Sequence, residues 1–410
     1  MDIAPANVVE MMTSFKRFIG LNDVMAYLTM MCIRLLELHR ILKETGSIFL
    51  HCDPTAGHYL KILLDTIFGK NNYRNEIIWH YRKWPSGHKQ FQRNHDSIFF
   101  YSKTDSDERI FNKVDLMERT ESTLKRFGKS KIISGYDNNG NRLPSQMDDE
   151  ESSGVPRDDV WDIGRVPPIK QLFPTQKPEL LLSRIIRAST NQNDVILDPF
   201  CGCGTSIIEA NYLKRKWIGI DITHLAINLI KWRLKDIYSL EPKTDYKVIG
   251  EPEDLEGAKE LASQNRYQFQ WWALSLINAR AYGDKKKGAD TGIDGFIFFS
   301  DEEGIYKKII IQIKSGNVSV KDIRDLGHVI SREKAEMGIF ITLELPTKPM
   351  IKEAVGAGYY RSLLTKKDYP KIQILTIEEL FDDKKPNIPQ SILSHKKAER
   401  PLMETHKLDL

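Results

Sequence analysis

The sequence predicts an α/β protein with two domains, and three observations support this. Helical and strand-like apolar patterns alternate over the first hundred residues and again from residue 174 to about 238. In the second of these stretches an apolar strand runs into a glycine-rich turn and then a helix, which is typical of a nucleoside-binding α/β unit. A separate, smaller α/β pattern follows residue 260, and 410 residues are enough for two or three domains.

The composition is that of an ordinary globular protein. The chain has 60 Lys and Arg against 56 Asp and Glu, with 41% hydrophobic residues, which excludes wholesale disorder. No apolar run approaches the ~20 residues of a membrane span, and the start lacks a secretory signal pattern. Four cysteines are too few for a disulfide scaffold, so we expect a reducing, cytoplasmic setting. Because no apolar run is long enough to span a bilayer, we expect no membrane partner.

The first hundred residues predict helix, strand, helix and then two strands. Apolar residues recur at helical spacing before Gly46, which ends the helix: Met25, Leu28, Cys32, Leu35 and Leu42. A short strand is expected over residues 47–51 and a helix over 58–68, followed by strands over 76–81 and 97–101. Residues 103–168 are polar and rich in turn residues, so we expect an irregular insertion outside the α/β core.

The sharpest motif is the turn after the strand at residues 195–198. Gly202 and Gly204 allow the backbone to turn tightly and to approach a ligand, and the next strand ends at Asp221, placed to accept both ribose hydroxyls. A dinucleotide fits less well, because Ile207 replaces the third glycine and Asp198 would repel phosphates. A ligand with a positive charge, such as an amino acid moiety or a sulfonium, suits Asp198; the alternative is a tight turn without a ligand.

The segment Asp198–Thr205 resembles the S-adenosylmethionine loop of DNA amino-methyltransferases, which methylate adenine N6 or cytosine N4. Residues 173–178 resemble the family segment that packs against the methionine end of the cofactor. The resemblance covers residues 20–240 in the permuted order of the β group, in which the catalytic half comes first. It implies a Rossmann-like methyltransferase sheet and these cofactor-binding residues: Thr175, Lys177, Pro178, Asp198, Phe200, Gly202, Gly204, Thr205 and Asp221.

One family motif is absent from this sequence. Members of the family hold the target amino group with an Asp/Asn-Pro-Pro-Tyr/Phe tetrapeptide and stack its aromatic ring on the flipped base. In the β group this motif precedes the helix expected over residues 25–43, where the chain has too few residues, so the sheet should be incomplete at the N-terminus. A truncated reading frame, a separate polypeptide carrying the motif, or a degenerate enzyme would each explain this. The chain alone is predicted not to methylate.

The last third predicts a metal site on a β-hairpin. A helix is expected over residues 261–282, a hairpin around Asp294, and a strand over 308–314 that places Gln312 and Lys314 on one face. Polar groups on an apolar central strand are costly unless something binds them. Asp294 and Gln312 are therefore candidate ligands of Mg²⁺, with Lys314 positioning water; the alternative is a hairpin with Gln and Lys exposed at a sheet edge.

This region resembles the Mrr-like branch of the PD-(D/E)xK nucleases, in which Gly-Ile-Asp is followed by Gln-x-Lys. The resemblance implies a Mg²⁺-dependent DNA endonuclease with catalytic residues Asp294, Gln312 and Lys314. The branch often has a carboxylate on its first helix, where this chain has Gln268 and Gln270.

Two basic stretches are candidate DNA contacts. In the first, aromatic residues alternate with basic ones, which suits phosphate contacts and stacking of an extruded base, although a solvated basic loop is the alternative. The second stretch, residues 285–287, borders the predicted nuclease hairpin, where its charges would face DNA phosphates. The predicted contacts are Arg82, Lys83, Lys89, Arg93, Lys286 and Lys287.

We therefore expect a restriction–modification protein acting on double-stranded DNA, with S-adenosylmethionine and Mg²⁺ as cofactors. The expected organisation is a methyltransferase domain over 1–240 with a target-recognition insertion at 103–168, a linker at 241–260, an Mrr-like endonuclease domain at 261–382, and a loose tail at 383–410. One alternative is a nuclease that uses the methyltransferase half only for specificity. The other is an inactive fragment that binds DNA or a partner.

Overall fold

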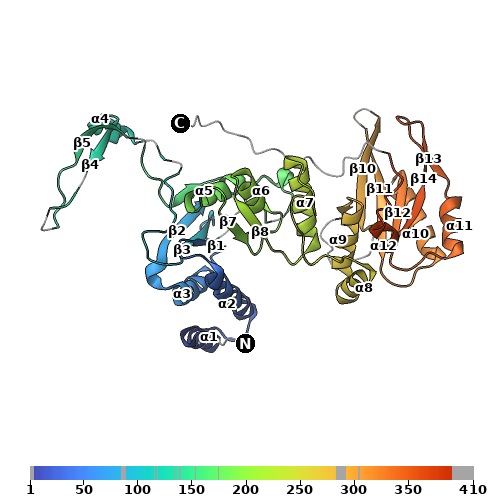
Figure 1. The fold of residues 1–410 in the computed structure, drawn as a ribbon, viewed down its shortest axis with the longest axis horizontal. Coiled ribbons are helices and arrows are strands. Elements are labelled where there is room, and N and C mark those ends of the chain that lie inside the picture. Colours follow the sequence, from blue (N-terminus) through green and yellow to red (C-terminus); the bar gives the residue numbers. More distant parts are fainter. Residues whose placement is uncertain are drawn as a thin grey trace. The chain divides into compact units, whose positions relative to one another are not determined.

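A four-stranded sheet with helices on both faces forms the centre of the first of two units in the computed structural model (Figure 1). The structure describes residues 4–389 except 85–88, 115, 118, 134, 138–139, 153, 174, 283–291 and 303–304. The first unit comprises residues 1–198 and 205–218, and the second comprises 199–204 and 219–410. The predicted α/β class is confirmed in both.

The sheet of the first unit has the strand order β1-β3-β2-β6. Strand β3 runs antiparallel to both neighbours, and β2 and β6 are parallel. Alternate side chains of β3 point to opposite faces, so that Phe99 and Tyr101 pack on one helical layer and Ile98 and Phe100 on the other. The strands are β1 (Ser47–Cys52), β2 (Tyr73–His80), β3 (His95–Ser102) and β6 (Val160–Asp162).

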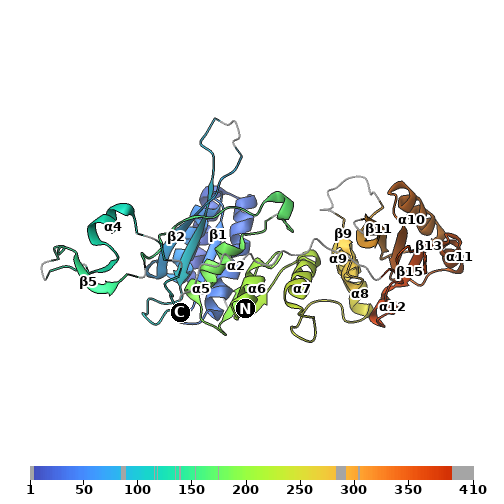
Figure 2. The same cartoon turned by 90° about the horizontal axis from the view of Figure 1, so that it is seen from above.

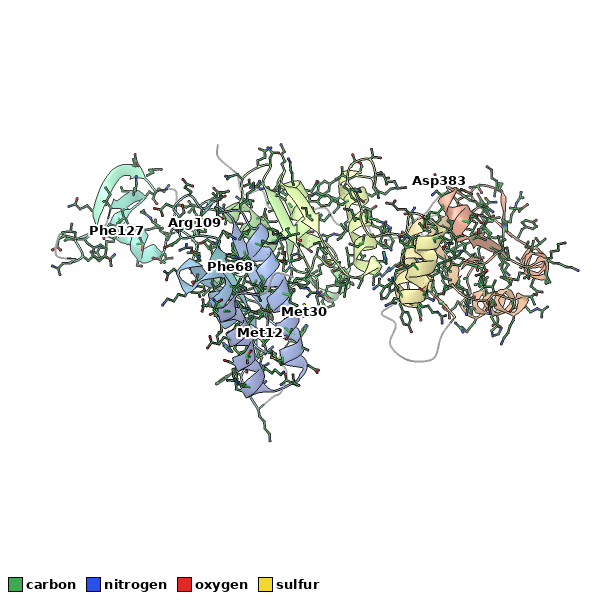
Figure 3. All side chains as sticks on the ribbon, turned by 60° about the horizontal axis from the view of Figure 1, so that its bottom comes forward. Met12, Met30, Phe68, Arg109, Phe127 and Asp383 are labelled. Atoms are coloured by element: carbon green, nitrogen blue, oxygen red, sulfur yellow. The ribbon has the colours of Figure 1, made fainter. Side chains whose placement is uncertain are left out.

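Three N-terminal helices cover one face of this sheet: α1 (Ala6–Ile19), α2 (Asp23–Ile41) and α3 (Gly57–Phe68). The predicted helices over 25–43 and 58–68 are confirmed as α2 and α3. Helix α2 begins where the Asn22 side chain accepts a hydrogen bond from the Met25 N–H at 3.0 Å. Met12, Met30 and Phe68, labelled in Figure 3, belong to the apolar layer between these helices and the sheet.

The two edge strands of this sheet differ in character. Strand β6 is short, and Asp158, Asp159 and Asp162 lie in or beside it. Short length and charged side chains are the features that protect natural edge strands from pairing with other chains. Among the described residues, strand β1 pairs with β3 alone, yet it carries no Asp, Glu, Lys or Arg over Ser47–Cys52, like an interior strand. Because β6 lies within 103–168 and buries Trp161, the prediction that this whole segment stays outside the core is wrong at its end.

The remainder of the insertion forms a small module of its own, as predicted. It contains helix α4 (Glu121–Phe127) and a two-stranded sheet of β4 (Ser130–Ile133) and β5 (Gln146–Glu151). Helix α4 buries none of its residues. Two single-turn 3-10 helices, η1 (Lys70–Asn72) and η2 (Pro168–Lys170), lie in connections of the first unit.

The first unit also contains a second, two-stranded sheet of β7 (Val195–Asp198) and β8 (Lys216–Gly219). Helix α5 (Glu179–Ser189) places Leu181 on the four-stranded sheet and packs on α6 (Thr205–Tyr212), which in turn packs on β7. The helical layer is thus continuous from one sheet to the other, whereas in the described part of the chain β1 and β7 each have one paired neighbour.

The second unit begins its helical part with α7 (His224–Tyr238), α8 (Leu255–Gln264) and α9 (Arg266–Leu276). Two predictions are wrong here. Helix α8 starts inside the expected linker and buries Ala258 completely. The single helix expected over 261–282 is broken at Asn265, because the Asn265 side chain accepts hydrogen bonds from the N–H groups of Tyr267 and Gln268 and starts a new helix.

A five-stranded mixed sheet with the order β15-β12-β11-β10-β9 forms the core of the second unit. Ile309, Ile311 and Ile313 of β11 pack on the α9 face and Ile310 on the α10 face, which confirms the predicted alternation. The elements are β9 (Arg280–Ala281), β10 (Gly295–Glu302), β11 (Ile305–Lys314), α10 (Val320–Arg332), β12 (Met337–Thr342), α11 (Lys348–Gly356), β13 (Tyr359–Arg361), β14 (Asp368–Pro370), β15 (Ile372–Thr376) and α12 (Ile377–Phe381). Within the described part of the chain, no helix is long and apolar enough to cross a bilayer.

Candidate cofactor loop and endonuclease-like site

Glycine is required in the turn at residues 199–204. Gly202 and Gly204 have φ angles of 50° and 71°, in the region that side chains disfavour. A Cβ on Gly204 would lie 2.5 Å from Cγ1 of Ile230 on α7, so no larger residue fits without a shift. The Gly204 N–H closes the turn on the Cys201 carbonyl at 2.7 Å. The loop is therefore preformed by its own backbone and by packing on α7.

Asp221 is bound directly to this loop. Its Oδ2 accepts a hydrogen bond from the Gly202 N–H at 3.0 Å, and its Oδ1 accepts from the Thr223 N–H at 2.9 Å. The Cys201 N–H donates to the Ile220 carbonyl at 3.0 Å, which fixes the loop beside the residue that precedes Asp221. The Thr223 hydroxyl also donates to Oδ1 at 2.9 Å. A carboxylate has about four acceptor positions, so Asp221 keeps capacity for about one further donor. The structure thus brings Asp221 and the glycines together, as the sequence predicted.

The loop also has an apolar and a buried side. The aromatic ring of Phe200 is half exposed, as is Ile220, and Ile222 is 88% exposed. On the other side the buried Arg233 guanidinium donates to the Cys203 carbonyl at 2.8 Å. An acid beside exposed apolar side chains is the combination that a nucleoside ligand requires.

Asp198 and Thr205, on either side of this turn in the sequence, belong to the first unit. The Ser206 hydroxyl donates to Oδ2 of Asp198, which ties the end of β7 to the start of α6. Thr205 is buried. Asp198 therefore has a fixed position at the end of a strand, where ligands of α/β sheets commonly bind.

The predicted methionine-contacting segment leads into α5. Pro174 lies outside the described residues. Lys177 donates to the Thr175 carbonyl at 3.2 Å, and the buried Pro178 is the N-cap residue of α5.

A polar cluster that sequence reasoning missed lies on the α5 face of the first sheet. Asp96 of β3 accepts hydrogen bonds from His51 Nε2 at 3.1 Å and from the Tyr81 hydroxyl at 3.0 Å. Burial opposes the Asp96 charge, but the His51 and Tyr81 hydrogen bonds and the Lys177 charge lower its pKa overall. These residues come from separate strands, and only the register of β1, β2 and β3 could have indicated the cluster.

The second unit places Asp294 against the backbone of the strand that carries Gln312 and Lys314. Oδ2 of Asp294 accepts the Ile313 N–H at 2.7 Å, and Ile313 lies between Gln312 and Lys314 on β11. Gln312 is only 6% exposed, and its amide donates to the Gly292 carbonyl. Lys314 Nζ lies 3.9 Å from Oδ1 of Asp322 on α10. Strand β11 is the middle strand of its sheet, so the edge-hairpin alternative is wrong.

The donor set fits a magnesium ion only in part. Asp294 supplies a carboxylate and Gln312 an amide carbonyl, but among the described residues no three His, Cys, Asp or Glu side chains gather at one point. On α9, where the nuclease branch often has a carboxylate, Gln270 is buried and Gln268 accepts a hydrogen bond from the His224 N–H at 2.9 Å. Any further ligands of an ion at this hairpin would have to be water or phosphate oxygens.

Four of the predicted DNA-contacting residues are exposed on the connection between β2 and β3 (Figure 2): Arg82, Lys83, Lys89 and Arg93. The Gln92 amide donates to the Lys83 and Trp84 carbonyls at 3.1 and 2.9 Å, which ties the two arms of this connection together. Lys286 and Lys287 lie outside the described residues.

A positive-φ glycine turn whose backbone binds an aspartate is typical of nucleoside-binding α/β proteins. A family model described as DNA methylase matches residues 10–231, which is more than half of the chain. The chain therefore belongs to the DNA methylase family. A second model, described as RMKL-like, methyltransferase domain, matches residues 177–304. Residues 267–382 match a model described as NACHT-associated inactive Restriction Endonuclease 1, so the second unit contains an endonuclease-like domain.

Individual proteins and solved structures are similar to parts of the chain. The type II methyltransferase M.HpaI of Haemophilus parainfluenzae is 27% identical over 247 residues, which cover 60% of this chain and 71% of the relative. The DNA adenine methyltransferase YhdJ of Escherichia coli (strain K12) is 28% identical over 211 residues, 50% of this chain and 66% of the relative. Among solved structures, the cytosine-N4-specific PvuII DNA methyltransferase aligns with 51% of this chain and 71% of that chain, at 13% identity and a TM-score of 0.36.

Proposed function

We propose that the chain is the cofactor-binding and DNA-binding part of a restriction–modification methyltransferase, which transfers a methyl group from S-adenosylmethionine to adenine N6 or cytosine N4. The observation that carries this proposal is the hydrogen bond between the Asp221 carboxylate and the Gly202 N–H in a loop that excludes larger side chains. The family membership and the named relatives support it.

The proposed roles follow from chemistry. Asp221 accepts a ribose hydroxyl, and the half-exposed Phe200 packs against the nucleoside. Asp198 carries the negative charge that suits the ammonium or sulfonium of the methionine end. Thr175, Lys177 and Pro178 contact the same end, and Gly202, Gly204 and Thr205 shape the turn.

Isothermal calorimetry with S-adenosylmethionine tests the cofactor site. We expect Asp221→Asn to weaken binding by about tenfold or more, because one charge-assisted hydrogen bond contributes about 1.5–3 kcal/mol. Asp325→Asn, an exposed aspartate on α10, is the matched control and should bind like the wild type. An unchanged affinity in Asp221→Asn, or no heat with the wild type, would contradict the assignment.

Methyl transfer is proposed to need the Asp/Asn-Pro-Pro-Tyr/Phe tetrapeptide that residues 1–410 lack, supplied by a further segment or by a second polypeptide. The edge of β1 supports this, because it has no paired strand among the described residues and carries no Asp, Glu, Lys or Arg, and such an edge is a template for another strand. The test is a methyl-transfer assay on duplex DNA with the chain alone and after co-expression with products of the neighbouring reading frames. Transfer by the chain alone would refute the need for a partner.

A second candidate activity is Mg²⁺-dependent DNA cleavage by the second unit. The contact of Asp294 with the backbone between Gln312 and Lys314 favours it, whereas the matching family model is described as inactive. Supercoiled plasmid with Mg²⁺ tests the activity: cleavage should be lost in Lys314→Ala and retained in the exposed control Lys321→Ala. If the wild type does not cut, the domain serves only as a binding module.

A further inference from the structure

Two cations converge on one aromatic ring at an end of the first sheet. Lys83 Nζ lies 5.0 Å from the centroid of the Tyr81 ring, and Arg165 Cζ lies 5.4 Å from the same centroid. Among the residues that the structure describes, neither cation forms an ion pair. No carboxylate of the described residues therefore offsets these two positive charges, and a bound anion would be attracted to both.

The ring beneath these cations is held firmly. Tyr81 is 3% exposed, its hydroxyl donates to Asp96, and its ring packs on Trp79 with centroids 4.9 Å apart. Burial and the neighbouring Asp96 raise the pKa of Tyr81 to about 12, so the hydroxyl stays a hydrogen-bond donor at neutral pH. His51 Nε2 forms a hydrogen bond with Oδ2 of Asp96, the carboxylate oxygen that Tyr81 does not contact. The two cations thus lie over a rigid platform.

The charges around the platform favour an anionic ligand. Asp96 is the acid in contact with Tyr81, and His51 and the Lys177 charge already stabilise it. Lys83 and Arg165 are both exposed, and they come from segments 82 positions apart in the sequence. An Arg guanidinium next to a Lys ammonium is a common arrangement for phosphate oxygens, because Arg binds two of them at once.

We propose that Lys83 and Arg165 form a phosphate-binding site over Tyr81 that takes a backbone phosphodiester of duplex DNA. This rests on the proposed function and adds Arg165 to the DNA-contacting surface. The phosphate would fix the register of the duplex on this end of the sheet without reading its sequence.

Fluorescence anisotropy with a labelled 30-base-pair duplex between 50 and 200 mM salt tests this site in the full chain. Each phosphate contact contributes about −0.9 to the slope of log affinity against log salt. We expect Arg165→Gln and Lys83→Gln each to reduce the steepness of that slope by about 1, and the double variant by about 2. Arg17→Gln, an exposed arginine on α1, is the matched control and should leave the slope unchanged.

The outcomes separate this site from the cofactor site. Unchanged slopes in both variants overturn the proposal, and so does a wild type that binds S-adenosylmethionine but no duplex at 50 mM salt. A tenfold loss of S-adenosylmethionine affinity in Arg165→Gln without a change of slope would assign the site to the cofactor carboxylate instead. Reduced slopes in a chain that gives no heat with S-adenosylmethionine support the phosphate site and contradict the proposed methyltransferase function.

Discussion

The proposed cofactor loop and the endonuclease-like hairpin both bind an aspartate through a backbone N–H, but their surroundings differ. The N–H of Gly202 in the turn binds Asp221, and the N–H of Ile313 on strand β11 binds Asp294. Around the loop, Phe200 and Ile222 are open to solvent. On the hairpin, Gln312 is buried on the middle strand and donates to the Gly292 carbonyl.

This difference shows that a sequence motif can be present without forming a site that a ligand can reach. Apolar side chains stay exposed beside the Asp221 carboxylate, so a nucleoside can gain burial there. At the hairpin the neighbouring isoleucines are already buried in the core, so a ligand could contact only polar atoms. This agrees with a match to a methylase family for one region and to a model described as inactive for the other.

The largest expected effect comes from filling the loop glycine. Gly204→Ala combines a disfavoured positive φ with a Cβ 2.5 Å from Ile230, and should lower the free energy of unfolding by about 2–4 kcal/mol. Gly250→Ala, also at positive φ but with open space around it, should cost only about 1 kcal/mol. Urea denaturation measures the free energy of unfolding of the two variants, and calorimetry measures their affinity for S-adenosylmethionine. Equal costs would break the claim that packing on α7 shapes the loop.

An intermediate effect is expected at Asp301, which has a structural role in the endonuclease-like unit. Burial opposes its charge, but the Ser362 and Tyr360 hydroxyls and the Leu363 and Leu364 N–H groups donate to it and hold its pKa well below the usual range. This stabilisation is present above the unfolded pKa of about 3.9 and is lost as the pH falls towards the folded value.

Asp301→Asn should therefore destabilise the second unit by about 1–3 kcal/mol at pH 7 and flatten the loss of stability below about pH 4. Urea melts from pH 2.5 to 7 measure this, with Asp325→Asn as control. A variant with the wild-type pH profile would show that the carboxylate charge does not contribute.

The smallest effect is expected at Asp96 in the first unit. His51, Tyr81 and Lys177 lower its pKa against burial, so it too stabilises the fold above the unfolded pKa and loses this contribution as the pH falls through its folded value. Its side chain is 20% exposed, so water weakens the interactions, and Asp96→Asn should cost about 1 kcal/mol at pH 7. A cost larger than that of Asp301→Asn, in the same urea melts, would reverse the ranking of the two acids.

Local patterns in the sequence were enough for much of the fold. Apolar spacing predicted α2 and α3, and alternation predicted the two faces of β11 around Ile310. They failed where contacts between distant segments decide the structure. Strand β6 is only three residues long and is a strand because β2 pairs with it. Helix α8 is ordered because Ala258 packs into a core built mostly from residues beyond 265.

By itself, the sequence determined features that depend on residues a few positions apart. These are the glycines that permit the turn and the Gln-x-Lys spacing that puts two polar groups on one strand face. These depend on backbone geometry, which acts locally. Only the tertiary structure decided which polar groups are already engaged, as with Gln312, and which charges converge from distant segments, as with Lys83 and Arg165 over Tyr81. Burial and electrostatic fields depend on neighbours in space, and these are set only when the whole chain has folded.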